Sequence, residues 1–245
     1  MHDDGSYDER AAARYDEGAA EHFAPDVVDP IVDRLAELAG SGDALEFGIG
    51  TGRIALPLVR RGVRVHGIDS SQPMVAMLRA KPGGGAIGVT IGDFATVVVD
   101  GTFSVAYLLF NTIMNLTTQD RQVACFRNAA AHLEPGGCFV IEVLVPDLRR
   151  LPPGETARVF HASEERWGID EYAVARQGLR SHHFETVDGR LERSSALYRY
   201  VWPSELDLMA ELAGMRLRER SAGWRREPFG DESRQHVSVW EKPRD

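Results

Sequence analysis

One stretch decides the fold: Ala44-Leu45-Glu46-Phe47-Gly48-Ile49-Gly50-Thr51-Gly52. Its first residues predict a short buried strand, and residues 53–61 predict a helix despite Pro57. Glycines at alternate positions let the backbone turn sharply and let a ligand approach without meeting a Cβ atom. The N-terminus of the next helix offers free N–H groups and a partial positive charge. The stretch therefore predicts a loop that binds a phosphate or a carboxylate.

The spacing of the glycines separates the candidate ligands. The dinucleotide fingerprint is Gly-x-Gly-x-x-Gly, but here the third glycine comes one position early, at Gly52, and Arg53 occupies the expected place. This spacing disfavours a nicotinamide cofactor. Asp69 ends the second predicted strand, and an acidic residue there accepts hydrogen bonds from both ribose hydroxyls of a nucleoside in folds of this kind.

Strands and helices alternate from residue 29 to residue 145. Asp29-Pro30 is a plausible N-cap and first position of a helix that ends before Gly40. This alternation predicts an α/β fold with a doubly wound, mostly parallel sheet. Strands are expected at 43–47, 63–68, 86–91, 103–110 and 138–145, and further helices at 73–80 and 119–133.

The pattern changes after Pro146. Residues 147–155 are rich in Pro and Arg, residues 156–202 alternate between polar and apolar, and Val187-Asp188-Gly189-Arg190 predicts a hairpin turn. We expect an inserted antiparallel β cap over residues 147–202, and a core formed by residues 1–146 and 203–245. In the core, a helix is expected at 204–213 and strands at 215–220 and 236–241.

Composition excludes several kinds of function. The 245-residue chain has a formal net charge of −9, which disfavours nucleic acid as a partner. No Gly-Lys pair forms a Walker A loop, and Cys125 and Cys138 lack the spacing of a zinc site, so no metal is expected. The acidic N-terminus and the absence of a long apolar run predict a cytoplasmic protein with no membrane partner.

The motifs resemble, in order, those of the class I S-adenosylmethionine-dependent methyltransferases of the small-molecule type. Residues 44–52 resemble motif I, and Gly67-Ile68-Asp69-Ser70-Ser71 with Met74 resembles motif II. Gly92-Asp93-Phe94 resembles motif III, and Phe110-Asn111-Thr112 resembles the end of the fourth strand. The segment from Trp202 to Trp240 resembles the closing helix and strand pair of the family, so the resemblance implies a Rossmann-like sheet with an antiparallel last strand.

The resemblance also implies the cofactor, S-adenosyl-L-methionine, and the residues that bind it. Glu46 would bind the methionine amino group, Asp93 the adenine amino group, and Phe94 would cover the adenine ring. Tyr15, in an N-terminal segment that covers the cofactor, would face the sulfonium. The implied cofactor-binding residues are Tyr15, Glu46, Gly48, Gly50, Gly52, Asp69, Ser70, Met74, Asp93, Phe94, Phe110 and Asn111.

The acidic composition and the expected cap favour a small-molecule substrate, such as a sugar or another natural product, methylated on nitrogen or oxygen. His182 and His183 alternate faces of a cap strand, so at most one points inward as a general base. Asn115 and Glu142 lie near the carboxyl ends of strands, where ligands bind. A nicotinamide-dependent oxidoreductase and a non-catalytic cofactor-binding subunit remain as alternatives, and a homo-oligomer is compatible with the sequence.

Overall fold

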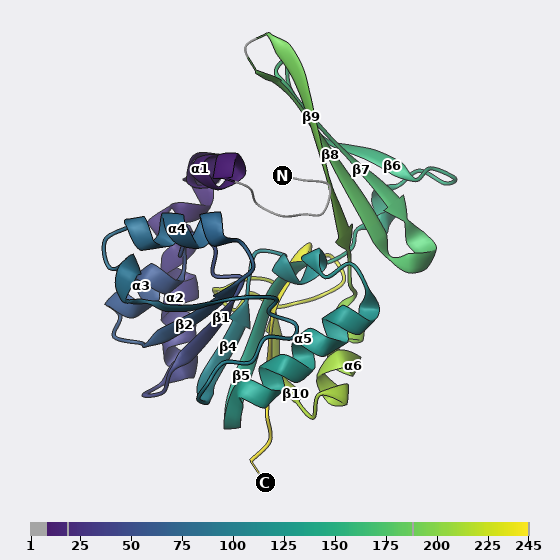
Figure 1. Ribbon diagram of the computed structural model, residues 1–245. Helices are drawn as coiled ribbons and strands as arrows, with labels where there is room; N and C mark the ends of the chain where they lie inside the picture. Colours follow the sequence, from purple (N-terminus) through teal and green to yellow (C-terminus); the bar gives the residue numbers. More distant parts are fainter. Residues whose placement is uncertain (1–8, 19, 188, 245) are drawn as a thin grey trace.

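The computed structural model describes residues 9–18, 20–187 and 189–244. A seven-stranded sheet with the order β10-β11-β5-β4-β1-β2-β3 forms its centre (Figure 1). Strand β11 runs antiparallel to β10 and to β5, and the other neighbouring strands of this sheet are parallel, which confirms the predicted fold class. The strands are β1 (Ala44–Phe47), β2 (Val65–Asp69), β3 (Gly88–Ile91), β4 (Phe103–Leu108), β5 (Leu133–Leu144), β10 (Arg216–Ser221) and β11 (Gln235–Glu241).

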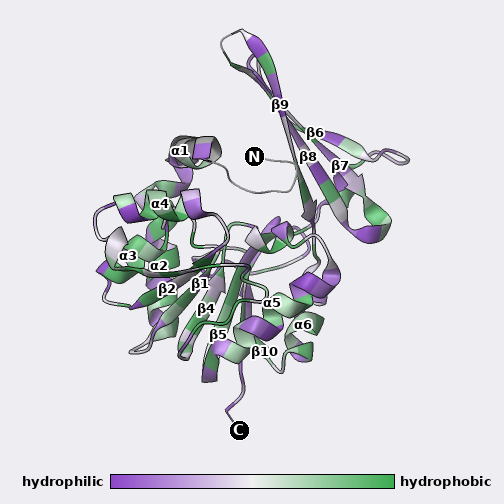
Figure 2. Ribbon diagram, in the orientation of Figure 1, coloured by the Kyte–Doolittle hydropathy of each residue, from purple (hydrophilic) through white to green (hydrophobic). Residues whose placement is uncertain are grey.

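Helices cover both faces of this sheet because successive residues of each buried strand point to opposite sides. Val105 and Tyr107 of β4 pack with one set of helices, and Ala106 and Leu108 pack with the other. The first set is α2 (Pro25–Ala39), α3 (Ala55–Arg60) and Leu78 of α4 (Gln72–Ala80); the second is α5 (Gln119–His132) and α6 (Pro203–Leu212). Figure 2 shows the central strands as predominantly hydrophobic.

Two predicted boundaries differ from the structure by several residues. Helix α2 begins at Pro25, not after Asp29, because Pro25 can fill the first helical position, where no N–H partner is needed. Pro30 therefore lies inside the helix. Strand β5 begins at Leu133, not at residue 138, since Leu133 already pairs with Phe103.

The N-terminal segment is more regular than the sequence indicates. It forms α1 (Glu9–Gly18) and the short helix η1 (Ala20–Phe23). Helix α1 packs against α4 at the end of the sheet where the parallel strands finish (Figure 1). No helix of the described residues is both long enough and apolar enough to cross a membrane.

Residues between β5 and α6 form a second, antiparallel sheet with the order β6-β7-β8-β9. It projects above the carboxyl ends of the parallel strands (Figure 1), and we call it the cap. The predicted hairpin joins β8 to β9, although Asp188 in its turn lies outside the described residues. The cap strands are β6 (Ala157–Ala162), β7 (Arg166–Ala173), β8 (Gly178–Val187) and β9 (Arg190–Arg199).

Candidate active site

A cavity of about 570 Å³ lies between the cap and the carboxyl ends of the parallel strands. Such an edge of an open α/β sheet is where ligands bind. Asn115 lines the cavity, and so do ten of the fourteen residues predicted to bind the cofactor or to act as a base: Tyr15, Gly48, Gly50, Asp69, Ser70, Met74, Phe94, Phe110, Asn111 and His183. Four do not line it: Glu46, Gly52, Asp93 and His182.

The glycine loop after β1 has the backbone that only glycine adopts easily. Gly48, Gly50 and Gly52 have φ values of 71°, 53° and 80°. A Cβ at Gly48 would lie 2.9 Å from Thr112 Cγ2, and one at Gly52 would lie 2.3 Å from Leu78 Cδ1. Gly48 and Gly50 line the cavity and present backbone without a side chain to it, whereas Gly52 allows the loop to pack closely against α4.

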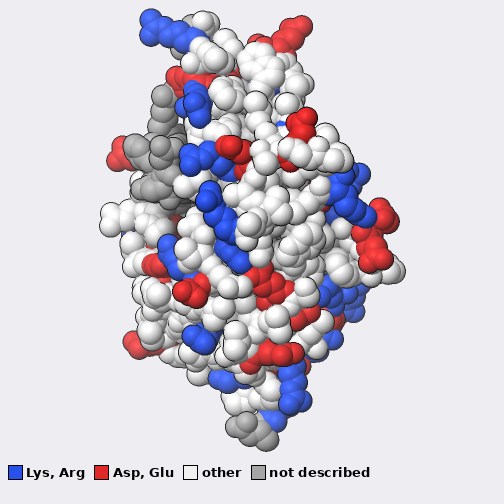
Figure 3. Space-filling model, turned by 90° about the vertical axis from the view of Figure 1, so that its right-hand side faces the viewer, with Lys and Arg blue, Asp and Glu red and all other residues white. Residues whose placement is uncertain are grey.

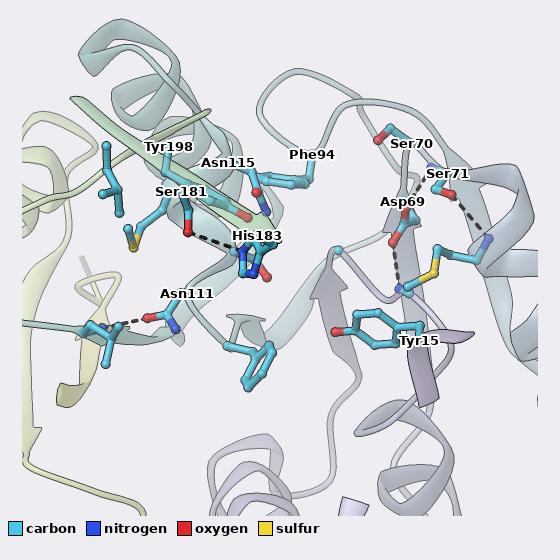
Figure 4. A pocket seen from close by; sticks show the side chains of 18 of the residues that line it. Tyr15, Asp69, Ser70, Ser71, Phe94, Asn111, Asn115, Ser181, His183 and Tyr198 are labelled. Carbon is cyan, nitrogen blue, oxygen red and sulfur yellow. Dashed lines mark hydrogen bonds between the residues drawn. The ribbon is translucent and has the colours of Figure 1, made fainter. Parts of the chain in front are cut away.

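Asp69 faces the cavity from the end of β2 (Figure 4). Its Oδ2 atom accepts a hydrogen bond from the Gly50 N–H at 2.7 Å, and its Oδ1 atom accepts one from the Ser71 N–H at 2.8 Å. Burial raises the pKa of Asp69, while these backbone hydrogen bonds oppose the rise. A carboxylate oxygen can accept more than one hydrogen bond, so both oxygens can also receive the two hydroxyls of a ribose.

Glu46 lies behind the glycine loop and is 6% exposed. The Tyr107 hydroxyl donates a 2.9 Å hydrogen bond to its Oε2 atom. Burial raises the pKa of Glu46 to about 8, against the opposing effect of this hydrogen bond. Within the described residues Glu46 has no ion-pair partner, so an ammonium group placed beside it would stabilise the charged form of its carboxylate. This environment fits the amino group of S-adenosylmethionine.

The two motif III residues, Asp93 and Phe94, differ in their position relative to the cavity. Phe94 lines the cavity and stacks on Phe47, with 5.9 Å between ring centroids. Asp93 points away, accepts a 2.9 Å hydrogen bond from the Ala95 N–H and forms an ion pair with Arg121. In this arrangement Phe94 is placed to cover a planar base, and Asp93 shapes the turn that carries it.

The N-terminal segment is attached to the glycine loop through Asp16, the neighbour of Tyr15. The Thr51 hydroxyl donates to Asp16 Oδ1 at 2.6 Å, and Lys81 Nζ lies 2.5 Å from Asp16 Oδ2. Lys81 also donates to the Thr51 carbonyl at 2.8 Å. These contacts hold Tyr15 at the edge of the cavity (Figure 4).

The cap supplies the opposite wall. His183 lines the cavity, and its Nε2 atom lies 3.3 Å from Ser181 Oγ (Figure 4). His182 points to the other face of the cap, where Nδ1 lies 2.7 Å from Ser195 Oγ and Nε2 lies 3.6 Å from Glu171. The alternation expected from the sequence thus selects His183 as the inward histidine.

Sequence reasoning missed several lining residues of the cap, chiefly Asp170, Ser181 and Tyr198. The signal for them is the strand register, because Asp170 pairs with Ser181 and both share the face of His183. That register was not deducible before the strands were paired. Trp224 lines a smaller second cavity, which shares Phe110 and Asn111 with the first.

Comparisons with known proteins decide the family. A family model described as a methyltransferase domain matches residues 44–137. The solved structure of the CcbJ methyltransferase from Streptomyces caelestis is 36% identical, covers 99% of this chain and 100% of its own, and has a TM-score of 0.87. The chain belongs to the class I S-adenosylmethionine-dependent methyltransferases. This methyltransferase is thus an enzyme with S-adenosylmethionine as its cofactor, which removes the nicotinamide and non-catalytic alternatives.

Two further proteins are similar to this methyltransferase, one in sequence and one in fold. It is 26% identical over 250 residues to the cypemycin N-terminal methyltransferase of a Streptomyces species, covering 99% of this chain and 100% of the relative. It shares its fold with CalS10, an amino pentose methyltransferase from Micromonospora echinaspora, at a TM-score of 0.69 and 21% identity, covering 99% of this chain and 100% of that one.

Proposed function

We propose that this methyltransferase transfers a methyl group to an amine nitrogen of a small natural product, such as an amino sugar, that binds beneath the cap. The observation that carries this proposal is that residues of the glycine loop and residues of the cap line the same cavity from opposite sides. The wall formed by the glycine loop and β2 suits the cofactor, and the cap wall presents Asp170, Ser181 and His183. The name of the cypemycin relative, an N-terminal methyltransferase, supports nitrogen as the acceptor.

Asp170 is suited to attract a cationic substrate. An aliphatic amine has a pKa near that of lysine, about 10, and therefore arrives as an ammonium ion at neutral pH. Asp170 lines the cavity and forms no ion pair among the described residues, although the charge of Arg158, its register partner on β6, acts on it. Burial raises the pKa of Asp170, but the hydrogen bond from Ser181 opposes that rise. An ammonium group beside it would hold the carboxylate in its charged form.

His183 is suited to accept the proton that the amine must lose before its lone pair can attack. Burial, followed by the charge of Arg166, lowers the pKa of His183, so the ring is neutral at pH 7. If the Ser181 hydroxyl donates to Asp170, its oxygen accepts from Nε2–H of His183, which leaves Nδ1 as the proton acceptor. Phe160 packs edge-on against the ring at 5.4 Å and holds its orientation.

The bound cofactor supplies a methyl group on a sulfonium, which is already activated for an in-line displacement. The protein's task is therefore to align the acceptor nitrogen and to exclude water. Tyr15 and Phe94 flank the cofactor side of the cavity, and the cap closes the other side. A hydroxyl acceptor is the second candidate, because the same His183 could serve as its general base.

The test is a turnover assay with matched pairs of small molecules that differ only in an amino or a hydroxyl group, including amino sugars. We expect methylation of the amine member, detected by mass spectrometry and by S-adenosylhomocysteine release. Methylation of the hydroxyl members alone would contradict the nitrogen assignment and favour the second candidate.

The charge of Asp170 is tested by the variant Asp170→Asn. Asparagine carries no charge to pair with the ammonium group of the substrate. The KM for the amine should therefore rise about tenfold or more, in line with about 1.5–3 kcal/mol for a hydrogen bond to a charged group. The affinity for S-adenosylhomocysteine, measured by calorimetry, should not change. Glu171→Gln is the matched control, since Glu171 is the next residue of β7 and lies on the outer face of the cap. An equal effect of both variants would contradict the role of Asp170.

A further inference from the structure

The end of β4 has an unusual backbone at the cavity. Phe110 and Asn111 are consecutive non-glycine residues with φ values of 55° and 61°. The left-handed region is uncommon for such residues, and a bulky phenylalanine there is strained. Strain of this kind persists only where the surrounding structure enforces it, and it often occurs at functional sites. Both residues line the cavity between the glycine loop and the cap.

Glu142 of the neighbouring strand β5 enforces this conformation. Its Oε2 atom accepts a 3.1 Å hydrogen bond from the Phe110 N–H, and its backbone oxygen accepts one from the Asn111 N–H at 3.2 Å. Asn111 Oδ1 in turn accepts from the Leu144 N–H at 2.8 Å (Figure 4). Hydrogen bonds therefore join both strained residues, Phe110 and Asn111, to the end of β5.

The second carboxylate oxygen of Glu142 is also occupied. Trp224, in the segment between β10 and β11, donates from Nε1 to Glu142 Oε1 at 2.9 Å. Glu142 lines the smaller neighbouring cavity of about 480 Å³ and not the larger one, so it does not contact the reacting groups. Its carboxylate serves to connect Trp224 to the end of β4.

The shape of the β4 end matters because the next residue touches the cofactor loop. A Cβ at Gly48 would lie 2.9 Å from Thr112 Cγ2, so Thr112 already packs directly on that glycine. A shift of residues 110–112 would change the position of the glycine loop relative to the wall that carries the acceptor. The distance between the acceptor atom and the methyl group is the quantity to which such a displacement is most sensitive.

We infer that Glu142 is a positioning residue for methyl transfer, which acts by bridging Trp224 to the strained end of β4. The inference rests on the proposed acceptor site beneath the cap. It gives a function to a carboxylate that sequence reasoning assigned only to the general region of the substrate. The Glu142 bridge, defined as Trp224, Glu142 and Phe110, should affect kcat more than the binding of either ligand.

The test is Glu142→Gln, which keeps the size of the side chain. Glutamine has one acceptor oxygen and an NH₂ group, so it can accept from Trp224 or from Phe110 but not from both on separate oxygens. We expect kcat to fall about tenfold or more, equivalent to about 1.4 kcal/mol or more in the barrier. The KM for the acceptor and the affinity for S-adenosylhomocysteine should change by less than about threefold, well under the 1.4 kcal/mol that a tenfold change represents.

A spectroscopic readout follows the bridge directly. The chain has four tryptophans, so a ¹H–¹⁵N spectrum should contain four indole signals, and Trp224→Phe identifies the one from Trp224. The chemical shift of that indole signal should change in Glu142→Gln. Glu134→Gln is the matched control on the same strand. Among the described residues its carboxylate accepts a hydrogen bond from Ser104 alone, at 2.6 Å, and Glu134 lines neither cavity. It should leave the indole signal and kcat unchanged.

Two outcomes would overturn the inference. One is a wild-type kcat in Glu142→Gln although the Trp224 signal has moved. The other is a loss of kcat accompanied by an equal loss of cofactor affinity and a lower melting temperature, which would mean that Glu142 only stabilises the fold. The variants are compared on whichever acceptor the wild type methylates, amine or hydroxyl. Failure of the amine proposal is therefore seen in the wild type, separately from failure of this one.

Discussion

At the scale of single residues, a shift of one position along a strand separates two chemically identical side chains. His182 and His183 are adjacent in β8, yet only His183 lines the cavity. His182 is hydrogen-bonded to Ser195 on the opposite face. The pair therefore provides an internal control for the proposed proton acceptor, since both substitutions remove the same group from the same strand.

We predict that His183→Ala lowers kcat about 10²-fold, the usual contribution of a general base, and that His182→Ala has little effect. Because burial lowers the pKa of His183, the acid limb of the wild-type kcat profile should lie below the ordinary histidine value of about 6.5. The rate should fall as pH drops through this limb, when the ring becomes protonated. The limb should disappear in His183→Ala. Equal activity of both variants would contradict proton transfer to His183.

At the scale of structural elements, a small polar cluster holds the N-terminal segment against the glycine loop. Lys81, at the end of α4, contacts both Asp16 and the carbonyl of Thr51. It also lies 5.4 Å from the ring centroid of Phe23 in η1. One side chain thus connects α1, η1, the glycine loop and α4. Such a contact can control how long the segment carrying Tyr15 stays over the cofactor.

We predict that Lys81→Met weakens S-adenosylhomocysteine binding about fivefold to tenfold, mainly through faster release. The magnitude, about 1 kcal/mol, reflects a partly exposed ion pair together with its hydrogen bond. Stopped-flow fluorescence would measure the release rate. Arg79→Met is the matched control, because Arg79 is an exposed cation on the same helix. If both variants release the ligand at the wild-type rate, the segment is held by other contacts.

The elements also show how much the sequence can predict. Hydrophobic patterning and glycine spacing predict β1, β2, β4 and the loop between β1 and α3, because local constraints determine them. Asp170 and the bridge between Glu142 and Trp224 could not be predicted, since they depend on which strands pair and in which register. Lys81 offered one signal, as one of only two lysines, but its partner Asp16 lies 65 positions away in the sequence.

At the scale of the whole molecule, acidic residues outnumber basic ones, with 37 Asp and Glu against 28 Lys and Arg. On the face shown in Figure 3, basic and acidic residues are interspersed over cap and core. This distribution agrees with the net charge of −9 and with a small substrate. The connection between cap and core is different, because there charged groups are buried.

That connection is a buried polar network around Glu205 of α6. Arg199, at the end of β9, is 5% exposed and donates to Glu205 Oε1 at 2.6 Å. Gln177, in the turn between β7 and β8, donates to Glu205 Oε2 at 2.7 Å, and Gln119 of α5 donates to Oε1 at 2.7 Å. Burial alone would raise the pKa of Glu205, but the hydrogen bonds from Arg199, Gln177 and Gln119 lower it overall. The network thus attaches the end of β9 and the turn between β7 and β8 to the core.

We predict that Glu205→Ala destabilises the protein by about 3–5 kcal/mol, because it leaves the buried guanidinium of Arg199 without its counter-charge. Urea unfolding would measure this, with Glu211→Ala, an exposed position on the same helix, as the control. The folded pKa of Glu205 is lowered, so its contribution is present above the unfolded value of about 4.3 and is lost as pH falls through the folded value. The stability difference between wild type and Glu205→Ala should therefore shrink below that pH. A variant as stable as the wild type at pH 7 would show that the cap does not depend on this network.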